Sequence, residues 1–228
     1  TDTLERSGFE VYLVGGCVRD LIFGREPKDW DVTTNANPEE IIKLFEKTVY
    51  EKSFGTDGVC VEIDSVSRAT KTEDVSCETI EYDIIEVTPY RLEAKYTDFR
   101  HPDEVKFADN LEDDLKRRDF TINAMALNNK GHIVDPYNGQ KDIKDKTLRT
   151  VGNPDDRFKE DALRMLRAIR FSVQLDFVVS QETAESIFKN SSLIKNISQE
   201  RIRDEFVKII MSKNPSIGIV MLQKFAFS

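Results

Sequence analysis

The chain has 228 residues and a formal net charge of −9, with 39% hydrophobic and 33% charged residues. A chain of this size forms one large globular domain or two smaller ones. The acidic balance argues against a protein that coats nucleic acid through bulk positive charge, and the apolar runs are too short to span a membrane. The first residues lack the basic and apolar regions of a signal peptide, so we expect a cytoplasmic protein with no membrane partner.

Charge is distributed unevenly along the chain. Residues 1–156 carry 21 basic and 34 acidic groups, a net charge of −13, whereas residues 157–228 carry 12 basic and 8 acidic groups, a net charge of +4. An acidic first part suits a divalent metal, and a basic second part suits phosphates. The three cysteines have no CxxC spacing, so neither a disulfide framework nor a structural zinc site is expected.

Strand and helix signals alternate in the first part of the chain. A β-branched run over 10–14 ends at a Gly-Gly pair, which predicts a buried strand and a tight turn. A helix over 18–23 with Gly24 as its cap, a strand over 30–34 and a helix opening at Asn37-Pro38 follow. Further strands are expected over 59–63, 83–87 and 124–127, and the polar stretch 65–79 predicts a loop or exposed hairpin.

Helical periodicity replaces the strand signals after residue 139, in runs over 158–171, 182–189, 200–211 and 215–225. We therefore expect an α+β fold, with a mixed-sheet head over 1–152 and an all-helical domain over 153–228. The chain stops almost where its last predicted helix does, which suggests a fragment of a longer protein.

Asp29 and Asp31 flank Trp30 at the start of a predicted strand. Alternate side chains share one face of a strand, so the two carboxylates would point the same way. Paired carboxylates of this kind suit Mg²⁺, which binds one or two of them and completes its shell with water and phosphate oxygens. A solvated surface pair is the alternative for this motif read by itself.

Gly15-Gly16 lies upstream and is followed by Arg19 on the first turn of a predicted helix. Glycines let backbone amides approach phosphate oxygens, and an arginine adds a bidentate contact. An ordinary strand-to-helix turn with a surface ion pair is the alternative. Together with the carboxylate pair, however, the turn indicates a nucleotidyl-transfer site.

Such a site needs a third acid that deprotonates or orients the attacking hydroxyl. Glu86 lies in a strand-like run of apolar residues, where an unpaired buried carboxylate is costly. It therefore faces either the metal or water, and the sequence does not choose between them.

The segment 117–124 concentrates polar groups around a short apolar pattern. Arg118, Asp119 and Asn123 are candidates to meet a triphosphate, a ribose hydroxyl and the backbone, respectively. A structural ion pair between Arg118 and Asp119 explains the first two equally well.

The segment 160–170 places four charged residues at helical spacing, which would form one polar stripe: Asp161, Arg164, Arg167 and Arg170. A solvated helix face is the alternative. An Asp-Arg pair also has the pattern that cytosine and adenine require, because both bases place an amino donor beside a ring-nitrogen acceptor. Uracil and guanine present an acceptor where the amino group would be.

The motifs together resemble one family, the class II tRNA nucleotidyltransferases (CCA-adding enzymes) and the related bacterial poly(A) polymerases. The resemblance covers residues 9–211 and is carried in order by GGCVRD, DWD, RRDFTINAMA, DPYNGQKD, EDALRMLRAIRF and ERIRDEF. It implies a polymerase β-like nucleotidyltransferase head followed by a helical neck, acting on the 3′ end of tRNA with CTP and ATP.

The resemblance also implies roles for individual residues. It places Mg²⁺ on Asp29 and Asp31, and base recognition on Asp161 and Arg164. Phosphate and ribose contacts are implied for Gly16, Arg19 and Arg118. By position, Arg167 and Arg170 match the family's remaining nucleotide-contacting arginines. The stretch 92–105 resembles the flexible loop that CC-only enzymes lack, which favours addition of the terminal A. The segment 51–82 is longer than the family's usual turn, and we expect the 228 residues not to include the family's body and tail domains. A poly(A) polymerase and a non-catalytic nucleotide- or RNA-binding module are the alternatives.

Overall fold

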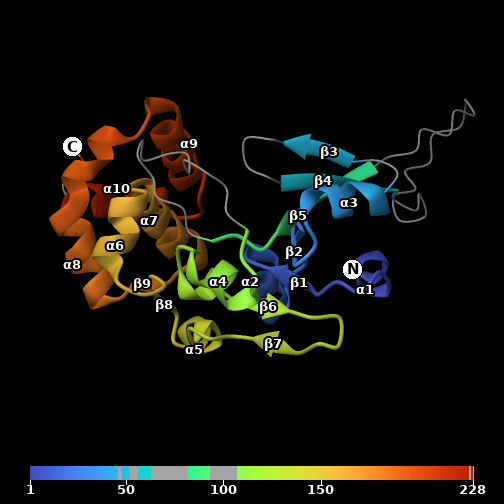
Figure 1. Cartoon of the computed structure of the whole chain (residues 1–228). Coiled ribbons are helices and arrows are strands. Elements are labelled where there is room, and N and C mark those ends of the chain that lie inside the picture. The colour runs from blue at the N-terminus through green and yellow to red at the C-terminus, as the bar shows by residue number, and fades with distance from the viewer. Residues whose placement is uncertain (46–47, 52–55, 63–81, 93–106, 226, 228) are drawn as a thin grey trace, which may run out of the picture.

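The computed structural model describes residues 1–45, 48–51, 56–62, 82–92, 107–225 and 227. The polar stretch predicted as a loop over 65–79 and the predicted flexible loop over 92–105 therefore lie largely or wholly outside the described residues. Figure 1 shows the sheet on one side of the molecule and the helices of the second part of the chain on the other.

A mixed seven-stranded sheet forms the first part, with the strand order β3-β4-β5-β2-β1-β6-β7. Strands β2 and β5 run parallel, whereas the other neighbours are antiparallel. The strands are β1 (Val11–Val14), β2 (Asp31–Thr34), β3 (Thr48–Glu51), β4 (Thr56–Glu62), β5 (Tyr82–Pro89), β6 (Ala126–Leu127) and β7 (Ile133–Val134). Each strand predicted from the sequence has a counterpart here.

The helices of this part are α1 (Asp2–Arg6), α2 (Gly16–Ile22), α3 (Pro38–Leu44), α4 (Leu111–Lys116), α5 (Gly139–Lys144) and the 3₁₀ turn η2 (Thr121–Asn123). Helix α3 begins where predicted because Asn37 caps it. The Asn37 side chain accepts from the Glu40 amide at 2.9 Å, and the Glu40 carboxylate accepts from the Asn37 amide at 2.8 Å. Helices α1 and α3 pack on one face of the sheet through Leu4, Val32 and Ile41.

The second part consists of α6 (Pro154–Glu160), α7 (Leu163–Leu175), α8 (Gln181–Asn190), η3 (Ser191–Asn196), α9 (Gln199–Ile210) and α10 (Pro215–Lys224). Two short strands, β8 (Thr147–Leu148) and β9 (Val178–Val179), pair in parallel beside these helices. The sequence does not predict them. None of the helices in the described part of the chain combines the length and apolarity that a membrane crossing requires.

The predicted continuous helix over 158–171 is wrong. Helix α6 ends at Glu160, Asp161 is extended with φ −145° and ψ 104°, and α7 begins at Leu163. Aspartate side chains compete with helical hydrogen bonds, and here Asp161 Oδ1 accepts from the Leu163 amide at 3.0 Å. The break removes Asp161 from the predicted helical stripe and leaves Arg164, Arg167 and Arg170 on α7.

One hydrophobic core joins the two parts of the chain. Val18 on α2 and Phe120 beside η2 are fully buried together with Phe158 on α6 and Ile169 on α7. The ring of Phe120 also meets that of Phe171 edge-on, with the centroids 5.7 Å apart. This shared packing fixes α7 against the turn between β1 and α2.

Candidate active site

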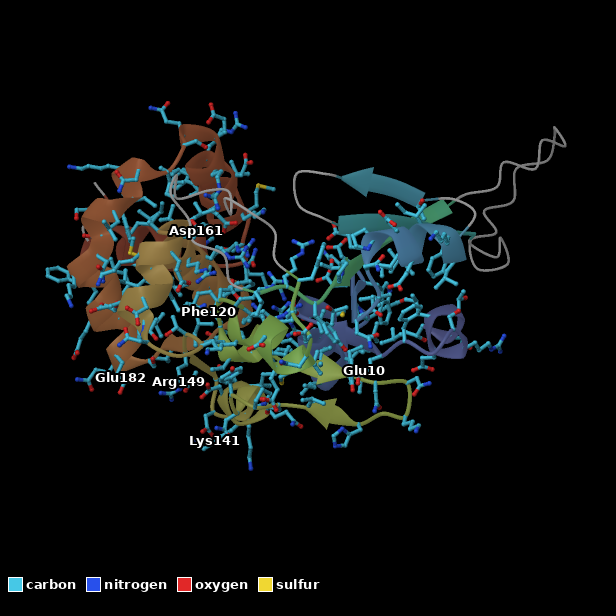
Figure 2. The ribbon with its side chains drawn as sticks, viewed as in Figure 1. Glu10, Phe120, Lys141, Arg149, Asp161 and Glu182 are labelled. Carbon is cyan, nitrogen blue, oxygen red and sulfur yellow. The ribbon has the colours of Figure 1, made fainter. Side chains whose placement is uncertain are left out.

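A cleft of about 550 Å³ lies where α7 faces the β1–α2 turn and the start of β2. Figure 2 shows Asp161 and Phe120 in this region, where the helices meet the sheet-bearing part. Twelve of the thirteen residues predicted from the sequence line the cleft, namely Gly15, Gly16, Arg19, Asp29, Asp31, Arg118, Asp119, Asn123, Asp161, Arg164, Arg167 and Arg170. Leu163, Phe171 and Arg201 complete the lining.

The turn between β1 and α2 requires glycine at its first position. Gly15 has φ 76° and ψ −132°, a backbone conformation that residues with a side chain rarely adopt. A β-carbon there would lie 3.0 Å from Arg118 Nη1 and 3.2 Å from Asp31 Oδ2. The missing side chain therefore lets a cation and a carboxylate approach the same point of the backbone.

Asp29 and Asp31 both line the cleft, although only Asp31 belongs to β2. The prediction that both lie on one strand is wrong, because the chain bends at Asp29 before the strand begins. Burial raises the pKa of Asp31, the nearby Arg118 opposes this shift, and the charge of Asp29 adds to it. A bound cation would offset both effects that disfavour the charged form of Asp31, its burial and the neighbouring charge of Asp29.

Glu86 lies on β5 directly opposite Asp31 in the parallel ladder. Paired residues of neighbouring strands point to the same face of a sheet, so Glu86 lies on the face of Asp31. It is exposed and is not among the residues that line the cleft. Across the described ranges, no group of three or more His, Cys, Asp or Glu side chains is arranged to hold a metal.

Arg118 and Asp119 do not pair with each other in the described structure. Arg118 Nη2 donates to Asp114 at 2.9 Å, whereas Asp119 accepts from Arg167 Nε at 2.8 Å and from Arg167 Nη2 at 2.5 Å. Burial would raise the pKa of Asp119, but Arg167 outweighs it and holds this pKa at about 2. Asp119 is therefore a charged anchor for an arginine of α7.

Asn123 links Arg19 to Asp119. Its Oδ1 accepts from Arg19 Nη1 at 2.7 Å, and its Nδ2 donates to Asp119 at 3.2 Å. These side-chain contacts replace the backbone contact expected from the sequence. Arg19 also donates from Nε to Asp20 at 3.0 Å, so its guanidinium is held on two sides while it lines the cleft.

Phe171 organises the arginines, a role that the sequence does not reveal because its spacing indicates only a core residue. The guanidinium carbons of Arg19, Arg167 and Arg170 lie 5.5, 5.4 and 4.4 Å from its ring centroid. Arginine over an aromatic face is favoured by the ring quadrupole. The ring therefore joins a cation from α2 to two cations from α7.

Asp161 and Arg164, the pair that the sequence suggests for base recognition, are each held by another charged side chain. Arg201 Nη2 on α9 donates to Asp161 Oδ2 at 2.8 Å, and Arg164 Nη1 donates to Glu160 at 2.6 Å. Arg164 also donates to the backbone carbonyls of Arg157 and Arg117. Sequence reasoning missed Arg201, although it belongs to the ERIRDEF motif that marked this helix.

The cleft is cationic although the whole chain is acidic. Six arginines and four aspartates line it, and Arg170 is also paired with the buried Glu205 of α9 at 3.1 Å. Several arginines and a carboxylate pair in one cleft suit a phosphorylated ligand with a divalent cation.

Comparison with known proteins shows which family shares this sequence and fold. Residues 11–149 match the family model of the poly A polymerase head domain, and residues 176–227 match that of a probable RNA- and SrmB-binding site of polymerase A. The CCA-adding enzyme of Ligilactobacillus salivarius is 43% identical over 219 residues, which is 96% of this chain and 50% of the relative.

Solved structures agree with the sequence comparison. The Bacillus stearothermophilus CCA-adding enzyme in complex with CTP superposes with a TM-score of 0.82 at 35% identity, over 98% of this chain and 50% of that one. The Thermotoga maritima CCA-adding enzyme complexed with tRNA gives a TM-score of 0.73 at 26% identity, over 98% of this chain and 48% of that one. The chain thus spans about half the length of these relatives. It belongs to the poly A polymerase head-domain family, and the relatives described above are CCA-adding enzymes.

Proposed function

We propose that the chain is the nucleotide-transferring part of a CCA-adding enzyme, which adds C and A to the 3′ end of tRNA from CTP and ATP. The observation that carries the proposal is a single cleft that is lined both by the carboxylates of Asp29 and Asp31 and by six arginines. The relatives support it, because they are CCA-adding enzymes and one of them was solved with CTP.

Asp29 and Asp31 would hold Mg²⁺. Carboxylate oxygens are the ligands that this ion prefers, and the half-buried Asp31 lies where a cation would offset both its partial burial and the charge of Asp29. When bound, the ion neutralises phosphate charge and stabilises the charge that develops during phosphoryl transfer.

The residues of the chain bind and orient the triphosphate. Arg19 and Arg118 would donate to its oxygens, and the bare backbone at Gly15 lets the phosphates approach. The 3′-hydroxyl oxygen of the tRNA then forms a bond to the α-phosphorus, and the bond from that phosphorus to pyrophosphate breaks. Glu86, on the same sheet face as Asp31, is our candidate to orient the hydroxyl and accept its proton.

Asp161 and Arg164 would select the base. The carboxylate accepts from the exocyclic amino group of cytosine or adenine, and the guanidinium donates to the adjacent ring nitrogen. Arg201 and Glu160 hold the two side chains in place, so the reading groups are fixed before the base arrives. Uracil and guanine would turn an acceptor toward the carboxylate and would be rejected.

We also propose a division of labour along the chain. A catalytic head over 1–152 would carry the carboxylates, and a helical neck over 153–228 would carry base recognition. Because the chain spans about half the length of its relatives, we expect it to bind CTP and ATP but to bind tRNA more weakly than a full-length relative does. Equal tRNA affinities would contradict this expectation.

The decisive experiment measures Mg²⁺-dependent incorporation of labelled CTP and ATP into tRNAs that end before the first C, after C, or after CC. Incorporation of both nucleotides in order supports the proposal. A addition after CC alone indicates an A-adding enzyme, and long A tails indicate a poly(A) polymerase. CTP binding without incorporation indicates a binding module.

Matched variants locate the chemistry. Asp29→Asn and Asp31→Asn each remove one charge and are expected to lower incorporation by at least about 100-fold, the scale of losing an electrostatic catalytic group. Asp145→Asn removes an exposed acid at the end of α5 and should leave incorporation unchanged. Full activity of either cleft variant would refute the assignment of the metal site.

A further inference from the structure

A buried carboxylate behind the cleft holds one of its arginines. Asp114 lies on α4, is 0% exposed and is not among the residues that line the cleft. Its Oδ1 accepts from Arg117 Nε at 3.0 Å and Nη2 at 2.6 Å, and its Oδ2 accepts from Arg118 Nη2 at 2.9 Å. The backbone amide of Arg91 donates to Oδ1 as well, at 3.3 Å. The carboxylate is thus surrounded by donors on both oxygens.

Of the two arginines that pair with Asp114, only one lines the cleft. Arg117 does not line the cleft, whereas Arg118 does. The two terminal nitrogens of Arg118 have different neighbours, because Nη2 donates a hydrogen bond to Asp114 whereas Nη1 lies beside Gly15. A guanidinium is planar and rigid, so fixing one terminal nitrogen sets the direction of the other. Asp114 therefore sets how Arg118 presents itself to the cleft.

Asp114 is held in its charged form by these neighbours. Burial by itself would raise the pKa of Asp114, but Arg118 and Arg117 outweigh it and lower the pKa below its ordinary value. A charged carboxylate forms a stronger hydrogen bond than a neutral amide of the same shape. Replacing Asp114 by Asn would therefore keep the size of the side chain while weakening its hold on Arg118.

We propose that Asp114 is a positioning residue for nucleotide binding, which orients Arg118 toward the triphosphate without touching the nucleotide itself. The proposal rests on the proposed function, because that function supplies the triphosphate that Arg118 meets. A purely structural ion pair would stabilise α4 without affecting how the protein distinguishes a triphosphate from a nucleoside.

The test compares the Kd of CTP and of cytidine for the whole chain in the presence of Mg²⁺. We expect Asp114→Asn to weaken CTP binding by about 10- to 100-fold, the range for a lost hydrogen bond between charged groups, and to change the Kd of cytidine by less than about 2-fold. Cytidine lacks phosphates, so it reports on the base-reading side of the cleft alone.

A double-mutant cycle identifies the arginine through which Asp114 acts. In an Arg118→Ala background, Asp114→Asn should have no further effect on the Kd of CTP. In an Arg117→Ala background, the effect of Asp114→Asn should persist. A merely structural role would give the same loss in both backgrounds.

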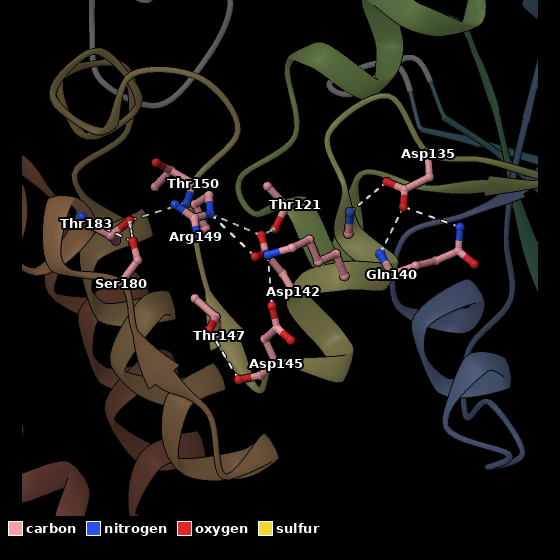
Figure 3. A network of polar contacts seen from close by, with 12 residues as sticks. Thr121, Asp135, Gln140, Asp142, Asp145, Thr147, Arg149, Thr150, Ser180 and Thr183 are labelled. Atoms are coloured by element: carbon pink, nitrogen blue, oxygen red, sulfur yellow. Dashed lines mark hydrogen bonds and ion pairs between the residues drawn. The ribbon is translucent and has the colours of Figure 1, made fainter.

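Asp142 provides a matched control within the same part of the chain. It is 3% exposed, accepts from Thr121 Oγ1 at 2.7 Å and pairs with Arg149 at 3.3 Å, and neither it nor Arg149 lines the cleft. Figure 3 shows this group beside Thr150 and Thr183, with Arg149 turned toward Asp142. Asp142→Asn also weakens the hold of a buried carboxylate on an arginine, here the partly exposed Arg149, so it should lower the unfolding midpoint in urea but leave the Kd of CTP unchanged.

The outcomes separate the inference from the function on which it rests. If the unaltered chain does not bind CTP, the proposed function fails. If it binds CTP and Asp114→Asn binds it equally well, or loses CTP and cytidine affinity alike, the role of Asp114 is refuted. Should Asp114→Asn not fold, Asp114→Glu keeps the charge but shifts the carboxylate by one methylene. It should then weaken CTP binding to an intermediate degree, and unchanged CTP affinity of this variant would overturn the proposal.

Discussion

Gly15→Ala is expected to damage both the stability and the activity of the chain. Gly15 has φ 76°, and an alanine β-carbon would lie 3.0 Å from Arg118 Nη1 and 3.2 Å from Asp31 Oδ2. Both distances are shorter than ordinary van der Waals contact for a β-carbon, so at least one of the two side chains must shift. Because these side chains belong to the proposed phosphate and metal sites, the shift would affect binding directly.

The size of the effect follows from two contributions. A non-glycine residue held in a sparsely populated backbone region costs about 1–3 kcal/mol, and the close contacts add to this cost. A loss of about 2 kcal/mol corresponds to a Tm lower by roughly 4–8 °C for a chain of this length. The neighbouring side chains must give way by a few tenths of an ångström. Because a misplacement of about 1 Å can cost about 100-fold in rate, we expect this smaller shift to lower kcat/KM by up to about 10-fold.

Thermal unfolding and CTP incorporation, measured on the same preparations, test this reasoning. Gly24→Ala is the matched control, because Gly24 also has a positive φ, 67°, but an added β-carbon there would meet no atom within 4 Å. It should lower Tm while leaving kcat/KM unchanged. If Gly15→Ala lowers Tm but retains full kcat/KM, the close approach at this turn is not what shapes the cleft.

Three further predictions concern stability and the arginines that line the cleft. Because Arg167 holds the pKa of the buried Asp119 at about 2, below its ordinary value near 3.9, Asp119 stabilises the fold by about 2–3 kcal/mol above pH 4. This stabilisation is lost as the pH falls from about 4 toward 2, and urea unfolding of Asp119→Asn should lack that part of the pH dependence. Phe171→Leu removes the ring beneath three guanidinium groups and should lower the free energy of unfolding by about 2–3 kcal/mol and weaken CTP binding. Asn37→Ala removes the cap of α3 and should cost about 1 kcal/mol in urea unfolding without changing CTP affinity.

Each of these has an outcome that would contradict it. An unchanged acid dependence in Asp119→Asn would mean that its carboxylate is not paired in solution. Phe158→Leu, at a fully buried position that does not line the cleft, should lower stability alone, so equal CTP affinities of the Phe158 and Phe171 variants would exclude a role for the second ring in binding. Loss of CTP affinity in Asn37→Ala would show that α3 is coupled to the cleft.

Local sequence patterns determined much of the fold and the membership of the site. Gly15-Gly16 predicts the turn before α2, and Asn37-Pro38 predicts the start of α3, because backbone conformation and capping depend on neighbouring residues. The motifs also predict twelve of the residues that line the cleft. Each of these inferences uses residues only a few positions apart, because local conformational preferences depend on near neighbours in the sequence.

Only the tertiary structure decided which charged groups pair. Arg167 reaches Asp119 across 48 positions and Arg201 reaches Asp161 across 40, whereas the sequence suggested an ion pair between neighbours at 118 and 119. The partner of a charged side chain depends on which helices pack together, and that follows from the shared hydrophobic core. The break at Asp161 and the position of Glu86 opposite Asp31 have the same origin, because helix ends and strand register are settled by contacts that spacing along the chain does not encode.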